Sequence, residues 1–510
     1  MSIASGLRRA LSPGFGVDVP ASLNLTGTLL KYLSLAAALP AAVAVGYGEP
    51  PWPFLGAGAI AAGAGLALER TTRGHEQAGL REGFLIVALT WVLAAGFGAL
   101  PYLLSGEDQF ANPLNAYFEA MSGFTTTGAT ILVDVNDLNH SLALWRQFTQ
   151  WLGGMGIIVL FLAVLPRLRV GGRQLLETEL PGPEIEPLAA SIRDTARRLW
   201  LLYIGLTLAQ ILALAALGWT GVDRRMGLYE AVAHAFTTLP TGGFSTEARS
   251  IEVFAAASQW VIVLFMLLAG ANFALTYAVV VRGRFRPLLR DEELRLYLTL
   301  LILGSAILAV EIWTEDLYGA SDSLRHGVFQ AVSTMTTTGF ASTDFNLWTT
   351  LAFVILVGLM FAGGSAGSTG GSVKVVRHLL IGRLLRRELD QTVHPELVAP
   401  VRLNRRVVDE RTLRAILAFV LLYIGIFAVG ALLLVLDASR TGLELRVIDA
   451  VAASATTLGN VGPGLGPAGP MGSFEAFSDF STGVMVVLMW LGRLEILPVA
   501  VLFTRAYWRA

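Results

Sequence analysis

One pattern of glycine and threonine occurs four times in the chain, as FTTTGAT (Phe124–Thr130), LPTGGFST (Leu239–Thr246), TTTGFAST (Thr336–Thr343) and TLGNVGPG (Thr457–Gly464). Each stretch follows a short amphipathic run and precedes a long apolar one. Because glycine reaches backbone conformations with positive φ, such a stretch can point successive carbonyl groups the same way. The pattern predicts four equivalent pieces of irregular backbone that present carbonyl oxygens to one axis.

The composition indicates an all-α polytopic membrane protein. Of the 510 residues, 54% are hydrophobic and 15% are charged, whereas about a quarter are charged in soluble domains. Cysteine is absent, which excludes disulfides, thiolate metal sites and thiol catalysis. Roughly 20 mostly apolar residues in a helix cross the hydrocarbon core. The ten candidate spans are Leu25–Tyr47, Trp52–Leu68, Phe84–Leu104, Leu142–Leu165, Leu199–Trp219, Trp260–Val281, Leu296–Trp313, Trp348–Met360, Leu413–Leu436 and Thr482–Phe503.

The arginines predict the orientation of these spans. Arginine-rich loops alternate with acidic ones, and loops with excess lysine and arginine stay in the cytoplasm. The arginine-rich regions are 70–81, 167–173, 282–290 and 377–414. We therefore expect these loops and both chain termini to be cytoplasmic.

The chain after its first two spans reads as four repeats. In each, a span is followed by a short segment with a polar residue before alanine, then by a Gly/Thr stretch and another span; the polar residues are Glu119, Glu230, Gln330 and Asp449. They precede Gly128, Gly243, Gly339 and Gly462 by 9, 13, 9 and 13 residues. A difference of four is about one helical turn, so repeats one and three form one pair and repeats two and four the other.

These units predict a central pore. The segments are too short to cross a membrane, and irregular backbone at that depth is tolerated only where it is buried or lines water. Helix C-termini would aim their partial negative charge at a cation, and carbonyl oxygens would replace its hydration shell. The alternative is four ordinary turns. The predicted boundaries are 1–75 for an extra N-terminal helix pair and 76–175, 176–290, 291–405 and 406–510 for the repeats.

At these residues the chain resembles the TrkH family of potassium uptake channels, in the superfamily that also holds KtrB and the plant and yeast HKT/Trk transporters. The resemblance covers almost the whole chain, including the two extra N-terminal spans. Matching motifs outside the four stretches are PGPE (Pro181–Glu184), GGSAGSTGGSVKVVR (Gly363–Arg377), VHPE (Val393–Glu396) and GRLEI (Gly492–Ile496).

The resemblance implies a selectivity filter that binds K+ through backbone carbonyls. The implied filter residues are Thr126, Thr127, Gly128, Thr241, Gly242, Gly243, Thr337, Thr338, Gly339, Asn460, Val461 and Gly462. In the fourth stretch Gly459 is the alternative to Gly462, and the 13-residue spacing favours Gly462. Pro240 departs from the expected pattern, and we expect it to affect the turn rather than the carbonyls. We expect the four polar residues before the stretches to anchor the filter backbone by hydrogen bonds.

The glycine-rich run 363–372 interrupts the eighth candidate span. Glycine costs roughly 1 kcal/mol in a helix interior, so we expect the span to break there. No Gly-Lys-Ser/Thr follows, which argues against a phosphate loop, and a flexible linker is the simpler alternative. The resemblance implies a gate that occludes the pore beneath the filter. The implied gate residues are Gly363, Gly364, Gly367, Gly370, Gly371, Lys374 and Arg493.

Two cations near this loop have open interpretations. Arg493 lies in the last candidate span, where a charge is costly unless it faces water or a partner; it either repels K+ in the pore or forms a structural ion pair with a carboxylate of another span. Glu495 lies on another side of the helix and is not its expected partner. Lys374 either binds a carbonyl at the loop end or extends to the membrane interface.

The expected function is potassium uptake across the bacterial inner (plasma) membrane, with a Na+- or H+-coupled K+ symporter as the alternative. We expect no enzymatic activity, because His140, His234 and His326 share no metal-ligand spacing and because Ser365 and Ser368 have no evident catalytic base. We also expect no cofactor on this chain and no nucleic-acid partner. The resemblance implies a homodimer in lipid and a cytosolic TrkA-type regulatory subunit that binds nucleotides. The basic region 377–414 is either the docking surface for this subunit or a solvated cytoplasmic loop that follows the positive-inside rule.

Overall fold

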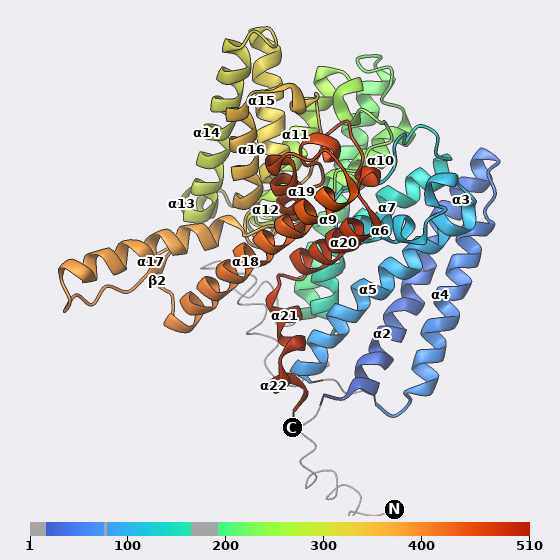
Figure 1. Ribbon diagram of the computed structural model, residues 1–510, viewed down its shortest axis with the longest axis horizontal. Coiled ribbons are helices and arrows are strands. Elements are labelled where there is room, and N and C mark those ends of the chain that lie inside the picture. Colours follow the sequence, from blue (N-terminus) through green and yellow to red (C-terminus); the bar gives the residue numbers. More distant parts are fainter. Residues whose placement is uncertain (1–16, 76–78, 165–191, 510) are drawn as a thin grey trace, which may run out of the picture.

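The computed structural model describes residues 17–75, 79–164 and 192–509, and this part of the chain is mostly helical (Figure 1). The PGPE motif and the arginines of region 167–173 lie outside the described residues. The long helices stand side by side, and shorter ones lie between them (Figure 1). This arrangement agrees with the expected all-α membrane protein.

The N-terminal part forms an antiparallel pair of spans. The first consists of α2 (Val19–Leu33), η1 (Ser34–Ala37) and α3 (Ala38–Tyr47), and the second is α4 (Trp52–Thr71). The two spans pack closely because Gly65 has no side chain: a Cβ atom there would lie only 2.6 Å from the carbonyl oxygen of Gly27. Both contact α5 (Leu80–Ser105), the first span of the remaining bundle.

Among the described residues, six helical stretches are long and apolar enough to cross a membrane. They are Val19–Tyr47, Trp52–Thr71, Arg81–Ser105, Arg197–Trp219, Glu292–Thr314 and Glu410–Thr441. The last three belong to α9 (Ile192–Trp219), α14 (Glu292–Thr314) and α18 (Glu410–Thr441). Two more candidate spans are α7 (His140–Val164) and the short α16 (Thr350–Ala362).

The candidate spans Trp260–Val281 and Thr482–Phe503 are each broken by a sharp bend, which the sequence analysis did not predict. α11 (Ala256–Gly270) and α12 (Phe273–Val280) meet at 113°, and α20 (Asp479–Arg493) meets α21 (Leu497–Ala500) and η7 (Val501–Phe503) at 110°. The first bend is stable because the Asn272 side chain caps α12. The freed Gly270 oxygen also accepts a hydrogen bond from Ser365 N at 2.8 Å. A hydropathy pattern does not reveal partners of this kind.

Four short helices lie between consecutive longer ones. They are α6 (Pro113–Phe124), α10 (Leu228–Thr238), α15 (Ala320–Met335) and α19 (Val447–Gly459). Each packs against the span before it and the helix after it, as α15 does between α14 and α16. The first three end where a Gly/Thr stretch begins, and α19 ends at Gly459, within the fourth stretch.

The remaining elements are one longer helix, a hairpin and several short helices. α17 (Val375–Val393) leads to a two-residue-per-strand hairpin of β1 (Arg402–Leu403) and β2 (Arg406–Val407), in which Arg402 pairs with Val407. The other short elements are η2 (Asp108–Phe110), η3 (Ser250–Val253), α13 (Arg286–Arg290), η4 (Phe345–Leu347), η5 (Gly466–Ala468), η6 (Phe474–Ala476) and α22 (Arg505–Trp508).

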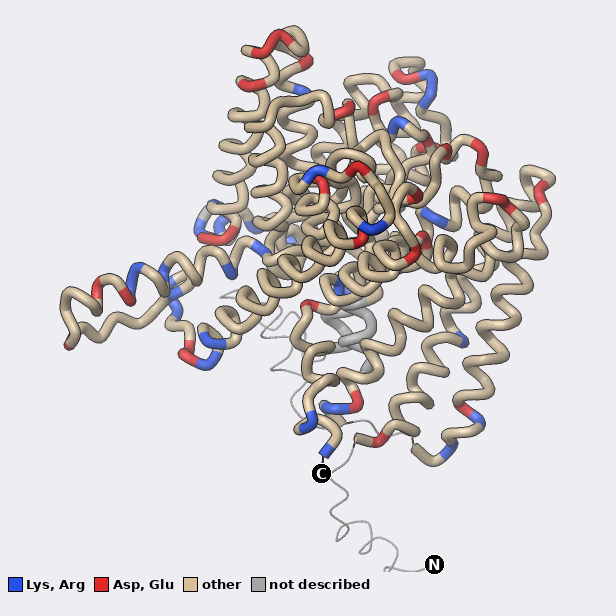
Figure 2. Tube along the Cα trace, in the orientation of Figure 1, with Lys and Arg blue, Asp and Glu red and all other residues tan. Residues whose placement is uncertain are grey.

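The charges divide the bundle into two ends. Lysine and arginine gather at the lower end of α4, around α22 and along α17, whereas acidic residues prevail at the upper end of α14 and α15 (Figure 2). Both ends of the described chain meet at the start of α5: Asp18 N donates to Glu82 Oε1 at 2.9 Å, and the Tyr507 hydroxyl donates to Arg81 O at 2.7 Å.

Candidate functional site

The four Gly/Thr stretches have the same backbone hydrogen bond. In each, the second of the three candidate filter residues donates its N–H to the carbonyl five residues earlier, in the preceding short helix. The pairs are Thr127–Ser122 at 2.9 Å, Gly242–Thr237 at 2.8 Å, Thr338–Ser333 at 2.8 Å and Val461–Thr456 at 2.9 Å. This shared bond aligns the four segments residue by residue.

The same alignment appears in the backbone angles. The first and third residues of each segment have positive φ and the second does not; the φ values are 52° and 84° for Thr126 and Gly128, 56° and 78° for Thr241 and Gly243, 60° and 82° for Thr337 and Gly339, and 53° and 111° for Asn460 and Gly462. Gly459 is the last residue of α19. In the fourth segment, Gly462 therefore has the conformation of the third residue in the other segments.

The segments contact one another in a closed cycle. Each third-position glycine abuts the middle carbonyl of another segment, so close that a Cβ atom would overlap its oxygen. The distances from such a Cβ are 2.1 Å for Gly128 to Gly242 O, 2.0 Å for Gly243 to Thr338 O, 1.9 Å for Gly339 to Val461 O and 2.7 Å for Gly462 to Thr127 O. The first segment thus meets the second, the second the third, the third the fourth and the fourth the first.

Two side chains tie the ring together, one from outside the segments and one from within the fourth, and the sequence interpretation missed the first of them, Gln150. Gln150 on α7 donates to Gly242 O at 2.7 Å and accepts from Phe244 N at 3.2 Å. Asn460 Nδ2 donates to Thr127 Oγ1 at 2.9 Å and so joins the fourth segment to the first. The available signal was the group of polar residues Arg146, Gln147, Thr149 and Gln150 in the first half of the candidate span Leu142–Leu165.

The polar anchors behave as two pairs. Glu119 accepts from Ile131 N at 3.1 Å and pairs with the buried Arg146, whose Nε is 2.6 Å away. With its amide oriented to satisfy both neighbours, Gln330 donates to Phe340 O and accepts from Ser342 N. The expectation that Glu119 and Gln330 anchor the returning backbone is therefore confirmed, although Arg146 was missed.

Asp449 and Glu230 do not anchor the returning backbone by hydrogen bonds as Glu119 and Gln330 do. Asp449 pairs with Arg446 at 2.7 Å in the first turn of α19, and Glu230 lies in the first turn of α10. Both residues are four positions farther from their glycine than Glu119 and Gln330 are from theirs, which is about 6 Å along a helix. They reach the start of the short helix rather than the segment that follows it.

The glycine-rich loop lies against the ends of these segments. α16 ends at Gly363, whose φ is 71°, as expected from the glycine run. Thr369 Oγ1 donates to Leu239 O at 2.9 Å, and Gly371 N donates to Thr337 Oγ1 at 2.8 Å. A Cβ atom on Gly371 would lie 2.4 Å from Gly459 O. The loop is largely buried and touches three of the four Gly/Thr stretches.

The bend between α11 and α12 holds the other side of the loop. Besides the bond from Ser365 N to Gly270 O, Phe273 N donates to Gly367 O at 3.0 Å. The bend between α11 and α12 and the glycine-rich loop therefore satisfy each other's free backbone groups.

Arg493 connects the loop to α7. It is 5% exposed, and its Nη1 donates to Thr369 O at 2.9 Å while its Nη2 donates to Gly153 O at 3.1 Å. Glu495 is turned elsewhere, as expected: it pairs with Lys374, 2.7 Å away, and with Arg377. Neither interpretation of Lys374, a carbonyl at the loop end or the membrane interface, included this partner 121 positions away.

The histidines are not gathered into one centre. His234 Nε2 lies 3.0 Å from Ser245 Oγ, and His326 Nδ1 lies 2.9 Å from Ser342 Oγ, each beside its own returning segment. His140 contacts Glu49 at the far end of α3. Among the described residues, no group of three His, Asp or Glu side chains could hold a metal ion.

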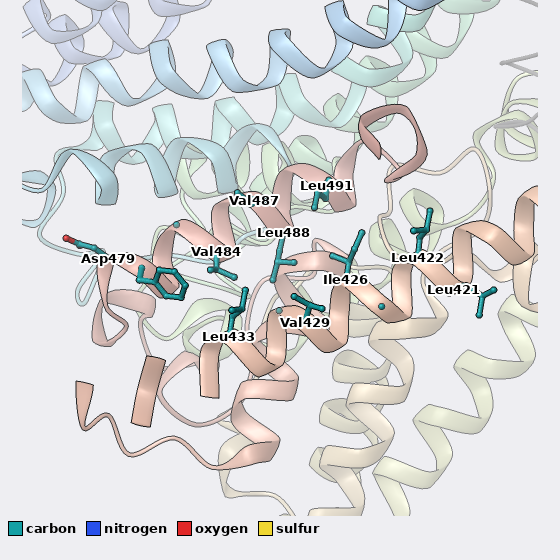
Figure 3. A pocket seen from close by; sticks show the side chains of 14 residues that line it. Leu421, Leu422, Ile426, Val429, Leu433, Asp479, Val484, Val487, Leu488 and Leu491 are labelled. Atoms are coloured by element: carbon teal, nitrogen blue, oxygen red, sulfur yellow. The ribbon is translucent and has the colours of Figure 1, made fainter. Parts of the chain in front are cut away.

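A large groove on the surface is also unsuited to a cation. It has a volume of about 850 Å³ and lies between α18 and α20, lined by apolar side chains such as Leu422, Ile426, Val484 and Leu488 (Figure 3). Asp479 is the charged residue among those that line it. This surface suits hydrocarbon contact rather than a hydrated ion.

Comparison with known proteins identifies the family. Residues 55–509 match the family model TrkH, described as a cation transport protein. "Trk system potassium uptake protein TrkH" of Salmonella typhimurium is 38% identical over 84% of this chain and 86% of its own length, and the Halomonas elongata protein of the same name is 36% identical over 96% and 98%. The crystal structure of the potassium transporter TrkH from Vibrio parahaemolyticus superimposes with a TM-score of 0.84 at 33% identity, over 96% of this chain and all of that one. These relatives are transport proteins rather than enzymes. The resemblance seen in the sequence is confirmed, and the chain belongs to the TrkH family of cation transport proteins.

Proposed function

We propose that this protein takes up potassium ions through a filter formed by the four Gly/Thr segments. The closed cycle of segments is the observation on which this rests, because four backbones of like conformation surround one axis. The names of the relatives, which are potassium uptake proteins, support the choice of ion. Potassium is the transported ion rather than a resident cofactor.

In this mechanism the backbone replaces water around the ion. The twelve filter residues predicted from the sequence supply carbonyl oxygens at three levels, four oxygens at each. The short helices α6, α10, α15 and α19 end at the ring, and each helix C-terminus contributes about half a negative charge. Carbonyl dipoles attract the cation without the tight binding that fixed carboxylates would produce, so the ion can also leave.

The glycine-rich loop and Arg493 form the gate in this proposal. The loop lies against the ends of three stretches, and Arg493 holds Thr369 within it. A guanidinium about 5 Å from K+ would repel it by roughly 3 kcal/mol at an effective dielectric near 20. Conduction then requires the loop, and Arg493 with it, to move away from the axis.

The setting follows from the charge distribution and from the family. The end with α17, the hairpin and α22 is rich in lysine and arginine (Figure 2), and by the positive-inside rule we assign it and both termini to the cytoplasmic side of the bacterial inner membrane. We propose that the protein works as a homodimer in lipid. A cytosolic TrkA-like nucleotide-binding subunit regulates it from the basic region 377–414.

Ion flux into proteoliposomes tests the proposal. We expect uptake of K+ and Rb+ that continues when the Na+ gradient and the pH gradient are removed one at a time. Absence of K+-selective flux would overturn the proposed function. Flux that stops when one gradient is removed would instead support the Na+- or H+-coupled symporter.

A further inference from the structure

The start of α14 contacts three segments that are far apart in sequence. Asp291, Glu292 and Glu293 are consecutive, and Asp291 caps the helix by accepting from Leu294 N at 2.7 Å. The three side chains then diverge: two reach the β1–β2 hairpin and α17, and the third reaches the glycine-rich loop.

Glu293 contacts the loop directly. Its Oε1 accepts a hydrogen bond from Ala366 N at 2.6 Å, and the residue is 4% exposed. Leaving a buried backbone N–H without an acceptor costs roughly 1–3 kcal/mol. Since the surrounding glycines offer little resistance to backbone rotation, this external contact is an important restraint on the position of the loop.

Asp291 and Glu292 hold the tip of the hairpin. Its turn residues Asn404 and Arg405 have φ values of 48° and 69°, as in a tight two-residue turn. Asn404 donates its side-chain amide to Asp291 Oδ2 at 2.9 Å and its backbone N–H to Glu292 Oε2 at 2.6 Å. Glu292 N donates to Asn404 Oδ1 at 2.9 Å in return.

The same carboxylate joins α17 to this unit. Arg383 Nη1 donates to Glu292 Oε2 at 2.9 Å and also contacts Arg402 O. The hairpin, α17 and the first turn of α14 are therefore connected by ionic hydrogen bonds at the arginine-rich end. Arg402, Arg405 and Arg406 of the hairpin are exposed, so an acidic protein surface could bind them.

We propose that Glu293 is a positioning residue that keeps the glycine-rich loop closed, and that the hairpin controls it. An acidic cytosolic partner that displaces the hairpin moves Asp291 and Glu292, and Glu293 then leaves Ala366 N. This inference rests on the proposed gating role of the loop and adds a route from the arginine-rich end to it.

Single-channel recording of the full-length protein in planar bilayers tests the route. Glu293→Leu removes the acceptor, and we expect the open probability to rise about tenfold, the size expected for the loss of one hydrogen bond. Glu293→Gln retains an amide oxygen that can accept from Ala366 N, and we expect an open probability close to that of the unaltered protein. A purely structural role would lower thermal stability in the Leu variant without changing gating.

A matched control lies on the same helix. Glu311, at the other end of α14, accepts from Thr349 Oγ1 at 2.8 Å, far along the helix from the loop. Glu311→Leu should leave the open probability unchanged. An equal rise in this variant would show general loosening of α14 and would overturn the proposal.

The hairpin provides a second, independent variant. Asn404→Ala loses the side-chain bonds to Asp291 and Glu292, and we expect it to raise the open probability in the same direction. Combined with Glu293→Leu it should add nothing further, because both act on one route. If the unaltered protein conducts K+ but neither variant changes its open probability, the inference fails while the proposed function stands. If the unaltered protein does not conduct K+, the proposed function itself fails.

Discussion

The four Gly/Thr segments and the glycine-rich loop are both irregular backbone within a helical bundle, but they are held in different ways. Each Gly/Thr segment is fixed by a main-chain bond to its own short helix, and its glycine abuts the carbonyl of another segment. The loop is held by contacts from distant parts of the chain, among them the Glu293 carboxylate and the Arg493 guanidinium.

This difference assigns rigidity and movement to different regions. In the ring, moving one segment disturbs two others, so the strained positive-φ residues are over-determined by their surroundings. The loop can shift after a few contacts are lost, as expected for a segment of low local stability. Substitutions of the same chemical kind should therefore have opposite effects in the two regions.

The largest effect is expected at the ring. In Gly339→Ala the new Cβ would lie 1.9 Å from Val461 O at a φ of 82°, so the third and fourth segments must separate. We expect K+ uptake to fall roughly 100-fold, because such strain and overlap amount to about 3 kcal/mol. Rubidium flux in proteoliposomes measures it. Gly382→Ala on α17, where a Cβ would meet nothing within 4 Å, is the control.

The ion pair at the loop end should have the next largest effect. Glu495→Gln leaves Lys374 and Arg377 without their shared carboxylate, and breaking this partly exposed pair should cost about 2 kcal/mol, less than the loss of a fully buried one. We expect a marked fall in thermal unfolding temperature in detergent. Glu69→Gln breaks the Lys31 pair of equal length, 2.7 Å, at a more exposed site, and should change the unfolding temperature little. Equal falls would contradict the assignment.

Within the loop, added bulk should open the pore rather than block it. Gly371→Ala places a Cβ 2.4 Å from Gly459 O and pushes the loop away from the ring. We expect an open probability about tenfold higher, as for the loss of 1–2 kcal/mol of closed-state stability. Gly358→Ala on α16, which has open space around its Cβ, should behave as the unaltered protein. A fall in flux would show that the loop does not gate.

The smallest effect tests the direct contact between ring and loop. Thr337→Val removes the hydroxyl that accepts from Gly371 N, and we expect a several-fold rise in open probability, the size of about 1 kcal/mol. Thr126 occupies the same position in the first segment, and its hydroxyl has no hydrogen-bond partner in the described structure. Thr126→Val should leave gating unchanged, so equal changes in single-channel recordings would refute the coupling.

Much of this molecule could be predicted from local sequence. Composition identified the membrane protein, and the spacing of polar residue and glycine gave the register of the four stretches, including the choice of Gly462 over Gly459. The break at Gly363 was also foreseen. These features depend on residues close together in the chain, through the conformational freedom of glycine and the length of a helical turn.

What the sequence did not reveal depends on partners that only packing brings together. The bends after Gly270 and Arg493, the pairing of Lys374 with Glu495 and the contact of Gln150 with Gly242 all join separate helices. A buried polar backbone group or charge requires a hydrogen-bond or ionic partner. The sequence indicates which groups require one, but not which residue supplies it. For the same reason Glu293 resembled an ordinary first-turn acid of a helix until the fold placed it against Ala366.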